Sequence, residues 1–374
     1  MSAQSQYDVI IVGGGPGGST AAWKLANAGL RPLILEAKEF PRVKLCAGWV
    51  TPPVWQDLEL DPQQYPLTIQ SFSRVRLLEH GRVRESQWSD IVGYGIVRRE
   101  FDNFLLERAM SAGAEVKFGV RVDKVESTPE GMQLQANGET YTARVVIGAG
   151  GTHCPIAKRF SPKPDDCLVV ALEAETHLSL NQLQSWTPFH GVPELAAEPD
   201  FLGYGWYFTK QDYLNIGVGS LRAGAPIRDR LERYRQDLVA AGRLPADATL
   251  ENFKGHSYYV NTHACPVAGD HWLLVGDSAG LAKPVSGEGI GPAIHSGRLA
   301  AAAICDYLKS GAPLAAYERA LRGPKRSRGW LSTVGAWCPA SLITVLAKTV
   351  CRVGPLRKRL LFEGCFGMRA KVSA

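Results

Sequence analysis

A glycine run near the start of the chain has the spacing of a dinucleotide-binding loop. Residues 13–18 read Gly-Gly-Gly-Pro-Gly-Gly, so Gly13, Gly15 and Gly18 form a GxGxxG pattern. The first glycine permits a tight turn, the second lets the backbone approach a pyrophosphate, and the third lets a helix pack against a strand. A helix that begins at this loop points its positive end at the phosphate charge. The pattern therefore predicts phosphate binding by the loop.

An acidic residue stands where such a loop needs a partner for a ribose. Glu36 lies eighteen residues past Gly18, and a carboxylate at that distance accepts hydrogen bonds from ribose hydroxyls. The surrounding sequence supplies a βαβ unit, with an apolar strand at 7–12, a helix at 17–28 and a second strand at 32–36. This motif by itself does not distinguish NAD from FAD.

A second glycine-rich stretch favours FAD. Residues 273–280 read Leu-Leu-Val-Gly-Asp-Ser-Ala-Gly and are followed by another glycine segment at 284–291. Asp277 ends a buried strand, where its carboxylate can hold the hydroxyls of an extended ribityl chain. Gly289 opens a long helix, whose N–H groups and positive dipole suit flavin N1 and O2, which become negative on reduction. NAD has no group that needs a second site so far along the chain.

Three aromatic residues alternate along another strand. Tyr204, Trp206 and Phe208 are two residues apart, so in a β-strand they share one face. Three aromatic rings on one face could line an apolar cavity. The alternative is an ordinary core strand that packs three aromatic side chains.

These motifs together resemble known flavoproteins. The segments at 13–18 and 276–290 are similar to those of the FAD-dependent oxidoreductases related to para-hydroxybenzoate hydroxylase. Three further segments resemble the geranylgeranyl reductase family within that group. Lys-Leu-Cys-Ala-Gly at 44–48 resembles its K-x-C-G-G loop, and 204–219 resembles its YxWxFP…GxG signature. Arg-Arg-Glu-Phe-Asp at 98–102 is similar to its RxxFD helix start.

The resemblance covers roughly residues 7–320 and implies reduction of an isoprenoid carbon–carbon double bond by reduced FAD. It implies that Cys46 lies beside the flavin, in proton delivery or substrate contact, and that Tyr204 and Trp206 line the substrate cavity. These three are the predicted catalytic residues. The alternative for Cys46 is structural, because cysteine packs as a small apolar side chain. The predicted cofactor-binding residues are Gly13, Gly15, Pro16, Gly18, Glu36, Ala37, Ala47, Gly48, Arg98, Val122, Asp277, Gly289 and Ile290.

Three positions depart from the family's pattern. Thr209 stands where the signature has proline, Ala47 replaces the first glycine after the cysteine, and Gly150 occupies the acidic position of the usual GADG loop. These departures leave flavin binding intact and put the family's usual substrate in question.

Two other functions fit the same sequence. A flavin monooxygenase or halogenase would use O2 and NAD(P)H to modify an aromatic or polyketide substrate, and 204–208 faintly resembles the WxWxIP strand of halogenases. The other alternative is a flavin-bearing structural or electron-carrier protein. The chain holds one dinucleotide fingerprint, so electrons are expected from NAD(P)H that binds transiently or from a protein donor such as ferredoxin.

The order of elements predicts an α/β fold. We expect a Rossmann-like FAD-binding domain, an inserted antiparallel β-sheet substrate domain and a C-terminal helical segment. The FAD-binding domain is expected at 1–70, 97–163 and 264–310, the β-rich substrate domain at 71–96 and 164–263, and the basic helical segment at 311–374. Further strands are expected at 74–88, 115–119, 144–147, 168–176, 201–209, 213–221 and 272–275, and further helices at 98–112, 226–241 and 289–308.

Charge is unevenly distributed along the chain. From Arg319 to the end, twelve Lys and Arg face one acid, Glu363, so the preceding 318 residues carry a net charge of −5 within the total of +6. A basic end on an acidic body favours phosphates, on a lipid surface or on a substrate; the alternative is a solvated helical face. No repeated aromatic pattern accompanies the charge, so nucleic acid is not an expected partner.

Composition bounds the cellular setting. Of the 374 residues, 45% are hydrophobic and 21% charged, which is typical of a globular protein. No apolar stretch has the length of a membrane span, and nothing resembles an export signal. The eight cysteines form no CxxC pair and are expected to be reduced, and no metal-ligand spacing is present. We expect a cytoplasmic protein that acts on a prenyl lipid or another apolar small molecule, with peripheral membrane contact through its basic end.

Overall fold

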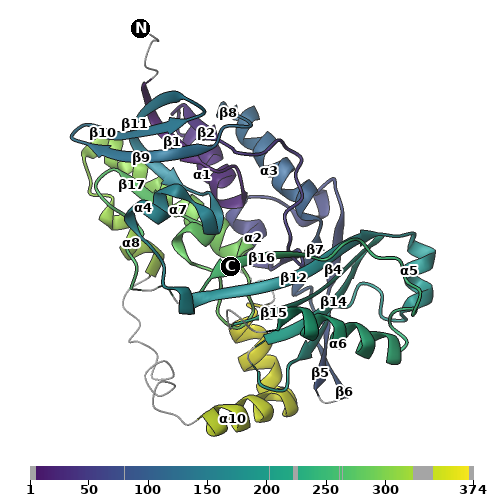
Figure 1. The fold of residues 1–374 in the computed structure, drawn as a ribbon. Helices are drawn as coiled ribbons and strands as arrows, with labels where there is room; N and C mark the ends of the chain where they lie inside the picture. Colours follow the sequence, from purple (N-terminus) through teal and green to yellow (C-terminus); the bar gives the residue numbers. More distant parts are fainter. Residues whose placement is uncertain are drawn as a thin grey trace.

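Two seven-stranded sheets and a smaller three-stranded sheet organise the chain (Figure 1). The computed structural model describes residues 6–79, 81–201, 203–221, 226–260, 262, 264–322 and 340–369. Of the basic residues near the C-terminus, Lys325, Arg326, Arg328 and Lys371 lie outside these ranges. No helix in the described ranges is long and apolar enough to cross a bilayer.

The first sheet carries the nucleotide motif. Its order is β8-β2-β1-β11-β10-β9, with β17 paired to the other edge of β11. The strands that pair in parallel are β1 (Gln6–Val12), β2 (Pro32–Leu35), β8 (Glu115–Lys117), β11 (Glu139–Gly148) and β17 (Trp272–Leu274). An antiparallel hairpin of β9 (Val122–Thr128) and β10 (Gly131–Ala136) extends the sheet from β11. The central parts of these parallel strands, residues 9–12, 32–35, 145–147 and 272–274, are apolar and buried, as burial on both faces of the sheet requires.

Three long helices pack beside one another over this sheet. They are α1 (Pro16–Asn27), α3 (Arg98–Ser111) and α7 (Ile290–Ser310), and α1 contacts both of the others (Figure 1). Close approach of α1 and α7 depends on glycine: a Cβ at Gly297 would overlap the carbonyl oxygen of Gly17. This contact brings two helix starts together that are more than 250 residues apart in sequence.

The second sheet is mostly antiparallel. Its order is β16-β12-β15-β14-β13-β5-β6. The strands are β5 (Arg74–Glu79), β6 (Arg82–Gln87), β12 (Leu168–His177), β13 (Glu194–Ala197), β14 (Gly203–Lys210), β15 (Tyr213–Ser220) and β16 (Lys254–Tyr259). Helix α6 (Ile227–Ala240) covers one face, where its Leu231 and Tyr234 pack with Leu214 and Ile216.

A small sheet joins the two large ones. It consists of β3 (Trp49–Val50), β7 (Gly93–Ile96) and β4 (Ile69–Phe72), with α2 (Pro52–Asp57) after β3. A Cβ at Gly95 would overlap the ring of Phe208, so glycine lets β7 lie directly on β14. The remaining short elements are α4 (Pro155–Phe160), α5 (Leu180–Trp186), η1 (Pro62–Gln64), η2 (Gly151–His153), η3 (Asp165–Cys167) and η4 (Gly276–Ala279).

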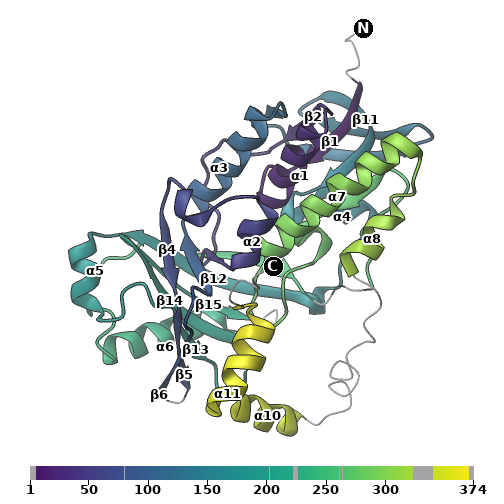
Figure 2. The ribbon, with the colours of Figure 1, turned by 180° about the vertical axis from the view of Figure 1, so that it is seen from behind.

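The C-terminal helices pack on the far edge of the second sheet. After α8 (Ala315–Arg322), the elements are α10 (Ala340–Arg352), α11 (Gly354–Leu356) and the π-helix η5 (Arg357–Cys365). They lie beside β5 and β6 (Figure 2). The Arg357 guanidinium donates to the hydroxyl of Ser86 at 3.0 Å and to the carbonyl of Glu85 at 3.0 Å, and Trp88 Nε1 donates to Glu363 at 3.0 Å.

The expected α/β architecture is confirmed. The structure differs in detail: the strand predicted at 115–119 ends at Lys117, and the β9–β10 hairpin was not anticipated. The buried residues of β9, Val122 and Val125, are three positions apart, so this strand lacks the alternation of period two that marks a strand in a sequence. The proposed domain boundaries remain a prediction.

Candidate functional site

The GxGxxG loop has the geometry that its glycines require. Gly13 has φ +107°, and a Cβ there would lie 2.5 Å from the carbonyl oxygen of Ala149. A Cβ at Gly18 would overlap the carbonyl oxygen of Gly13. Gly15 caps α1, whose first residue is Pro16. The first N–H groups of α1 therefore face outward from the loop with no intrahelical partner.

Glu36 closes this loop from the end of β2. Its buried carboxylate accepts the N–H of Gly14 at 2.7 Å and that of Lys38 at 3.0 Å. The N–H of Val120 donates to the backbone carbonyl of Glu36 at 2.9 Å, which brings the segment leading into β9 alongside. Ala37 is exposed at this end, whereas Val122 is buried at the start of β9.

The second glycine segment meets the first in space. Asp277 lies in η4, and a Cβ on Gly289 would be 3.1 Å from its Oδ1. Gly289 caps α7 and Ile290 is its first residue. A Cβ on Gly17 would lie 3.0 Å from the carbonyl oxygen of Ala293 in α7. The start of α7 and Asp277 therefore lie beside the start of α1.

These residues fit FAD. Glycine occupies each point where a Cβ would close the loop, and the orphan N–H groups of α1 and α7 supply donors for a pyrophosphate and for a flavin edge. Glu36 after β2 and Asp277 after β17 supply carboxylates that suit the ribose and ribityl hydroxyls of an extended dinucleotide.

The loop that carries Cys46 is pinned by the second sheet. Lys210, completely buried, donates from Nζ to the carbonyls of Ala47 at 3.2 Å and Ile96 at 3.0 Å, and also to Glu175. Asn215 Nδ2 donates to the carbonyl of Cys46 at 3.3 Å. These acceptors satisfy a cation that burial would otherwise make costly.

Gly48 completes that loop. It has φ +71°, and a Cβ there would overlap the carbonyl oxygen of Ile96. The N–H of Gly48 donates to the Cys46 sulfur at 3.4 Å. Positive φ together with close backbone contact makes glycine necessary here.

Arg98 lies at the start of α3 and is fixed by its own helix. Its guanidinium donates to both oxygens of Asp102, at 2.7 and 2.8 Å. Burial acts to lower the pKa of Arg98, but the Asp102 carboxylate more than offsets this and raises it. The thiol of Cys46 also interacts with this guanidinium, so the predicted residues Arg98 and Cys46 are neighbours.

Arg42 is a positively charged group that the sequence did not single out. Its Nη2 lies 3.5 Å from where a Cβ on Gly15 would be, and its Nη1 lies 3.3 Å from Asp102. It therefore stands directly over the phosphate loop. The signal that could have found it is weak, because an arginine in an irregular loop has no periodic pattern around it.

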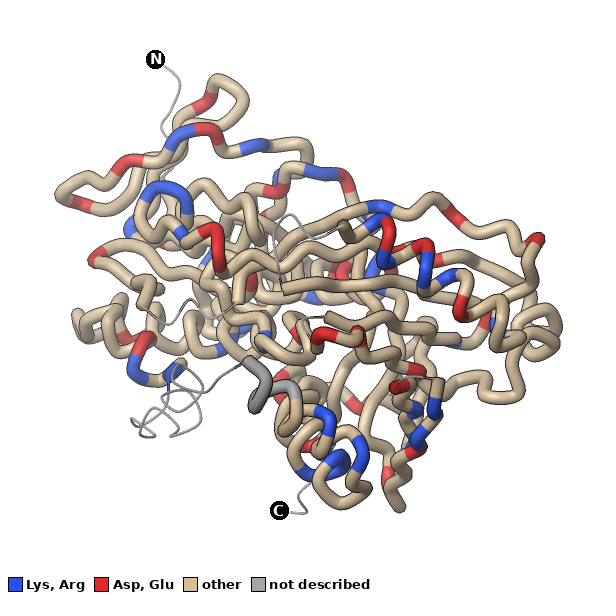
Figure 3. Tube along the Cα trace, turned by 60° about the horizontal axis from the view of Figure 1, so that its bottom comes forward, with Lys and Arg blue, Asp and Glu red and all other residues tan. Residues whose placement is uncertain are grey.

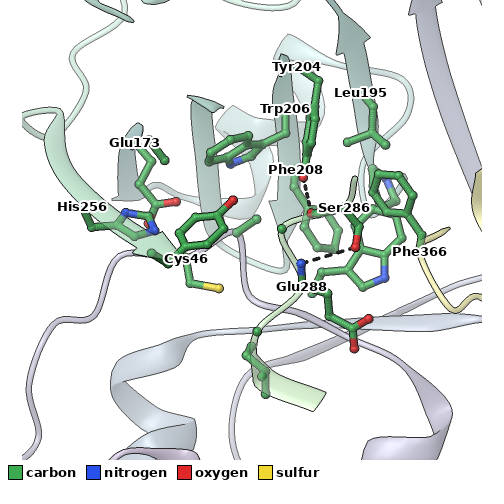
Figure 4. A pocket seen from close by; sticks show the side chains of 18 of the residues that line it. Cys46, Glu173, Leu195, Tyr204, Trp206, Phe208, His256, Ser286, Glu288 and Phe366 are labelled. Atoms are coloured by element: carbon green, nitrogen blue, oxygen red, sulfur yellow. Dashed lines mark hydrogen bonds between the residues drawn. The ribbon is translucent and has the colours of Figure 1, made fainter. Parts of the chain in front are cut away.

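One face of the second sheet forms the wall of a tunnel. Tyr204, Trp206 and Phe208 lie on this face, hereafter the tunnel face, as their spacing predicts (Figure 4). Gly217 is opposite Trp206, and a Cβ there would overlap the indole ring. The glycines of the GxG motif thus let the indole lie flat on β15. Trp206 Nε1 donates to Asn215 at 2.7 Å.

Two adjoining cavities run along the tunnel face. The inner one holds about 90 Å³ and is lined by Cys46, Gly289 and Ile290. The outer one holds about 150 Å³ and is lined by Phe201 and Leu361, among others. Both are lined by Leu195, Tyr204, Trp206, Tyr258, Gly287 and Phe366. The shared residues place the two cavities side by side, and both linings are mainly apolar.

Sequence reasoning missed two titratable residues at the inner end. Glu173 on β12 is 1% exposed, and burial raises its pKa to about 8. His256 on β16 has its pKa lowered to about 3 by burial and by the charges of Lys44 and Arg98. Both line the inner cavity beside Cys46 (Figure 4). An acid within the apolar run of β12 was the available signal for Glu173.

Comparison with known proteins places these features in context. The model of an NAD(P)-binding Rossmann-like domain matches residues 11–43. A digeranylgeranylglycerophospholipid reductase of Methanosphaerula palustris is 31% identical over 342 residues, which cover 85% of this chain and 82% of that protein. A geranylgeranyl diphosphate reductase of Rhodobacter capsulatus is 30% identical over 318 residues, covering 82% of this chain and 77% of that protein.

Solved structures share the fold. A geranylgeranyl bacteriochlorophyll reductase-like protein of Thermoplasma acidophilum superposes with a TM-score of 0.74 at 24% identity, covering 86% of this chain and 84% of that one. The halogenase PltM gives a TM-score of 0.68 at 16% identity, covering 84% and 73%.

Proposed function

The chain belongs to the geranylgeranyl reductase family of FAD-dependent oxidoreductases, and we propose that it reduces carbon–carbon double bonds of a geranylgeranyl group or another prenyl-lipid chain. The observation that carries this proposal is the apolar passage that runs from Cys46 and Gly289 to Leu361. A prenyl chain is long, flexible and uncharged, so it gains from burial along aromatic walls and leaves no polar group unsatisfied.

The cofactor residues divide into two groups in this proposal. Gly13, Gly15, Pro16 and Gly18 hold the pyrophosphate, with Glu36 at the ribose. At the flavin end the remaining members are Ala47, Gly48, Arg98, Asp277, Gly289 and Ile290, while Ala37 and Val122 flank the ribose end. FAD, when bound, supplies the hydride, which leaves the protein to exclude water and place a proton.

The tunnel face supports the reacting alkene. Hydride addition to an isolated double bond must be coupled to protonation, which develops positive charge on the more substituted carbon. The rings of Tyr204 and Trp206 lie along the passage and stabilise such charge. The Tyr204 hydroxyl is turned away to donate to the carbonyl of Ser286, which leaves its ring face to the substrate. Cys46 lies at the inner end, in substrate contact or proton delivery.

An anaerobic assay tests the reductase function. Protein reduced with dithionite and supplied with geranylgeranyl diphosphate should yield a product two mass units heavier per reduced bond, by mass spectrometry. Trp206→Ala should keep its FAD and lose this turnover. Product formed only with O2, and hydroxylated or halogenated, would instead support the monooxygenase or halogenase alternative. Flavin cycling with a protein partner and no product would support the carrier.

The electron donor is proposed to be NAD(P)H that binds transiently, or a protein donor such as ferredoxin. In this proposal FAD occupies the site of the single dinucleotide-binding motif in the sequence. Bleaching of the flavin absorbance by NADPH or NADH within the turnover time would support the nicotinamide. Bleaching only by reduced ferredoxin would support the protein donor.

We further propose that the C-terminal helices rest on anionic lipid at the cytoplasmic membrane face. Lys and Arg gather on these helices (Figure 3). Their exposed apolar side chains recur at helical spacing and are Val345, Leu346, Val353, Leu356 and Leu360. Lys348 and Arg359 lie among them. Leu361 of the same segment lines the outer cavity, so a lipid substrate would enter directly from that surface.

Not all of the basic side chains serve this surface. Arg352 pairs with Glu79 at 3.0 Å, and Lys358 donates to the carbonyl of Gln87 at 2.9 Å.

Vesicle co-sedimentation tests the proposal. Wild type should pellet with vesicles of phosphatidylserine and phosphatidylcholine, and Leu356→Ser should weaken this by about tenfold, since burying one leucine contributes about 1.5–3 kcal/mol. Met110→Ser, an exposed site on α3, is the control. Equal pelleting of Leu356→Ser and wild type would contradict the proposal.

A further inference from the structure

A buried carboxyl group with an unused oxygen lies at the inner end of the tunnel. Glu173 is 1% exposed and lines the inner cavity, and its Oε2 has no hydrogen-bond partner among the described residues. Glu175, two residues along the same strand, contrasts with it because its carboxylate pairs with Lys210. A buried charged carboxylate without a partner is costly, so such a group is held neutral.

The register of the second sheet aims Glu173 into the tunnel. Glu173 is opposite Gly217 on β15, which is opposite Trp206 on β14. A Cβ at Gly217 would lie 2.8 Å from the Glu173 Cβ. Because residue 217 has no side chain, the Glu173 carboxyl and the Trp206 indole can both lie over this part of the sheet. Figure 4 shows Glu173 and His256 together on one side of the cavity, with Cys46 close by.

We propose that Glu173 is the general acid that delivers the proton to the substrate double bond. This role rests on the proposed reductase function. One alkene carbon gains a C–H bond from the hydride, and the other gains a C–H bond as the O–H bond of Glu173 breaks. The alkene is reduced by two electrons, reduced FAD is oxidised by two, and the Glu173 carboxylate recovers a proton from water before the next turnover.

The surroundings keep the acid protonated until it is needed. Burial and the neighbouring Glu175 raise the pKa of Glu173 to about 8, against the opposing effects of Lys210, Lys44 and the Cys46 backbone. The titratable and charged groups around it are Glu175 on β12, Lys210 and Tyr204 on β14, His256 and Tyr258 on β16, Lys44 and Cys46 of the loop, and Arg98 beyond them. His256 carries no charge at neutral pH because its pKa is about 3.

His256 lines the cavity beside the acid. Its Nδ1 is buried and has no hydrogen-bond partner among the described residues. Because its imidazole is already neutral at neutral pH, His256 is not the donor.

Steady-state kinetics of the holoenzyme test the assignment. Glu173→Gln keeps the shape of the side chain but removes the acid, so kcat should fall by about 100-fold or more with KM little changed. Wild-type activity should fall as pH rises through 8, and this limb should be absent from Glu173→Gln. Glu173→Asp should restore part of the rate together with the pH limb. Glu198→Gln, which alters a partly buried acid paired with Arg230 outside both cavities, should match wild type.

A readout independent of turnover completes the test. Infrared spectra of the wild-type protein near neutral pH should contain the stretching band of a buried protonated carboxyl, lost in Glu173→Gln and retained in Glu198→Gln. If Glu173→Gln saturates the prenyl chain as fast as wild type, and with the same loss of activity above pH 8, Glu173 is not the general acid. If the wild-type protein saturates no prenyl chain, the proposed reductase function is itself wrong. A failure of the Glu173 proposal and a failure of the reductase proposal therefore give different results.

Discussion

At the scale of single residues, the tunnel face combines aromatic rings with carboxyl groups that differ in their hydrogen-bond and ion-pair partners. Glu175 is paired with Lys210, whereas Oε2 of Glu173 has no hydrogen-bond partner among the described residues and burial raises the pKa of Glu173. Glu36 and Asp277 follow parallel strands, close to the starts of α1 and α7. In the proposals above, carboxyl groups therefore act as a structural ion, a neutral acid and hydroxyl acceptors.

The pKa of Glu173 predicts a pH dependence of stability. Between its ordinary value of 4.5 and about 8, the folded state binds one proton that the unfolded state has lost. Stability therefore falls as pH rises through this window, by about 1.4 kcal/mol per pH unit from this group. Glu173→Gln should become more stable relative to wild type as pH rises from 5 to 8. Urea denaturation at several pH values measures this. Glu107→Gln, an exposed site on α3, should run parallel to wild type.

Asp277 should be required for FAD retention. Its carboxylate is the acceptor placed beside Gly289 at the start of α7. Asp277→Ala removes hydrogen bonds to the ribityl hydroxyls, each worth about 1.5–3 kcal/mol for a charged acceptor, so affinity should fall by at least about tenfold. The ratio of flavin to protein absorbance after purification measures it. The exposed Asp270→Ala should purify fully yellow. A fully yellow Asp277→Ala would contradict the placement of the ribityl site.

At the scale of elements, the cofactor groove depends on the contact of α1 with α7. A Cβ at Gly297 would overlap the carbonyl oxygen of Gly17, so the two helix starts come together only because one residue lacks a side chain. The loop of Cys46 depends likewise on two side chains of the second sheet, Lys210 and Asn215. Helix packing thus brings the two glycine segments together, and the second sheet holds the loop of Cys46.

Gly297→Val should separate these helices. Overpacking of this kind typically costs about 1–3 kcal/mol, and here it also moves apart the N-terminus of α1, proposed for the pyrophosphate, and that of α7, proposed for the flavin edge. We expect a lowered melting temperature, loss of FAD, and a larger melting shift on adding free FAD than in wild type. Gly354→Ala, where a Cβ would meet open space, is the control. Unchanged flavin content in a folded Gly297→Val would exclude this contact as the determinant.

At the scale of the whole molecule, the C-terminal segment contributes to the walls of both cavities. Phe366 packs against Trp49 at 5.6 Å and Tyr204 at 6.0 Å between ring centroids, and it lines both cavities. Arg357 ties the same segment to β6. A part of the chain that the sequence presents mainly as a basic end therefore also lines the two cavities of the tunnel face.

Phe366→Ala should open this wall. Truncating a buried phenylalanine costs about 3–5 kcal/mol, and the two cavities should merge further. We expect a lower unfolding midpoint, and a product distribution from mixed prenyl diphosphates shifted toward longer or bulkier chains, by mass spectrometry. Phe366→Leu should retain most of the stability and the original preference. An unchanged preference in a folded Phe366→Ala would place chain selection elsewhere.

The sequence by itself determined the nucleotide fold and the two cofactor motifs. Gly13–Gly18, Glu36 and Gly276–Ile290 are local patterns, since each depends on backbone conformations set within a few residues. The alternation of Tyr204, Trp206 and Phe208 likewise fixed a shared face, because the period of a strand is two.

Only the tertiary structure decided what shares that face. Glu173, Gly217, Trp206 and His256 meet through the register of β12, β15, β14 and β16, strands whose pairing no local pattern specifies. The burial of Lys210 and the docking of Phe366 arise in the same way. Burial sets the pKa of Glu173 and the apolar character of the passage, and burial is a property of long-range packing rather than of residue type.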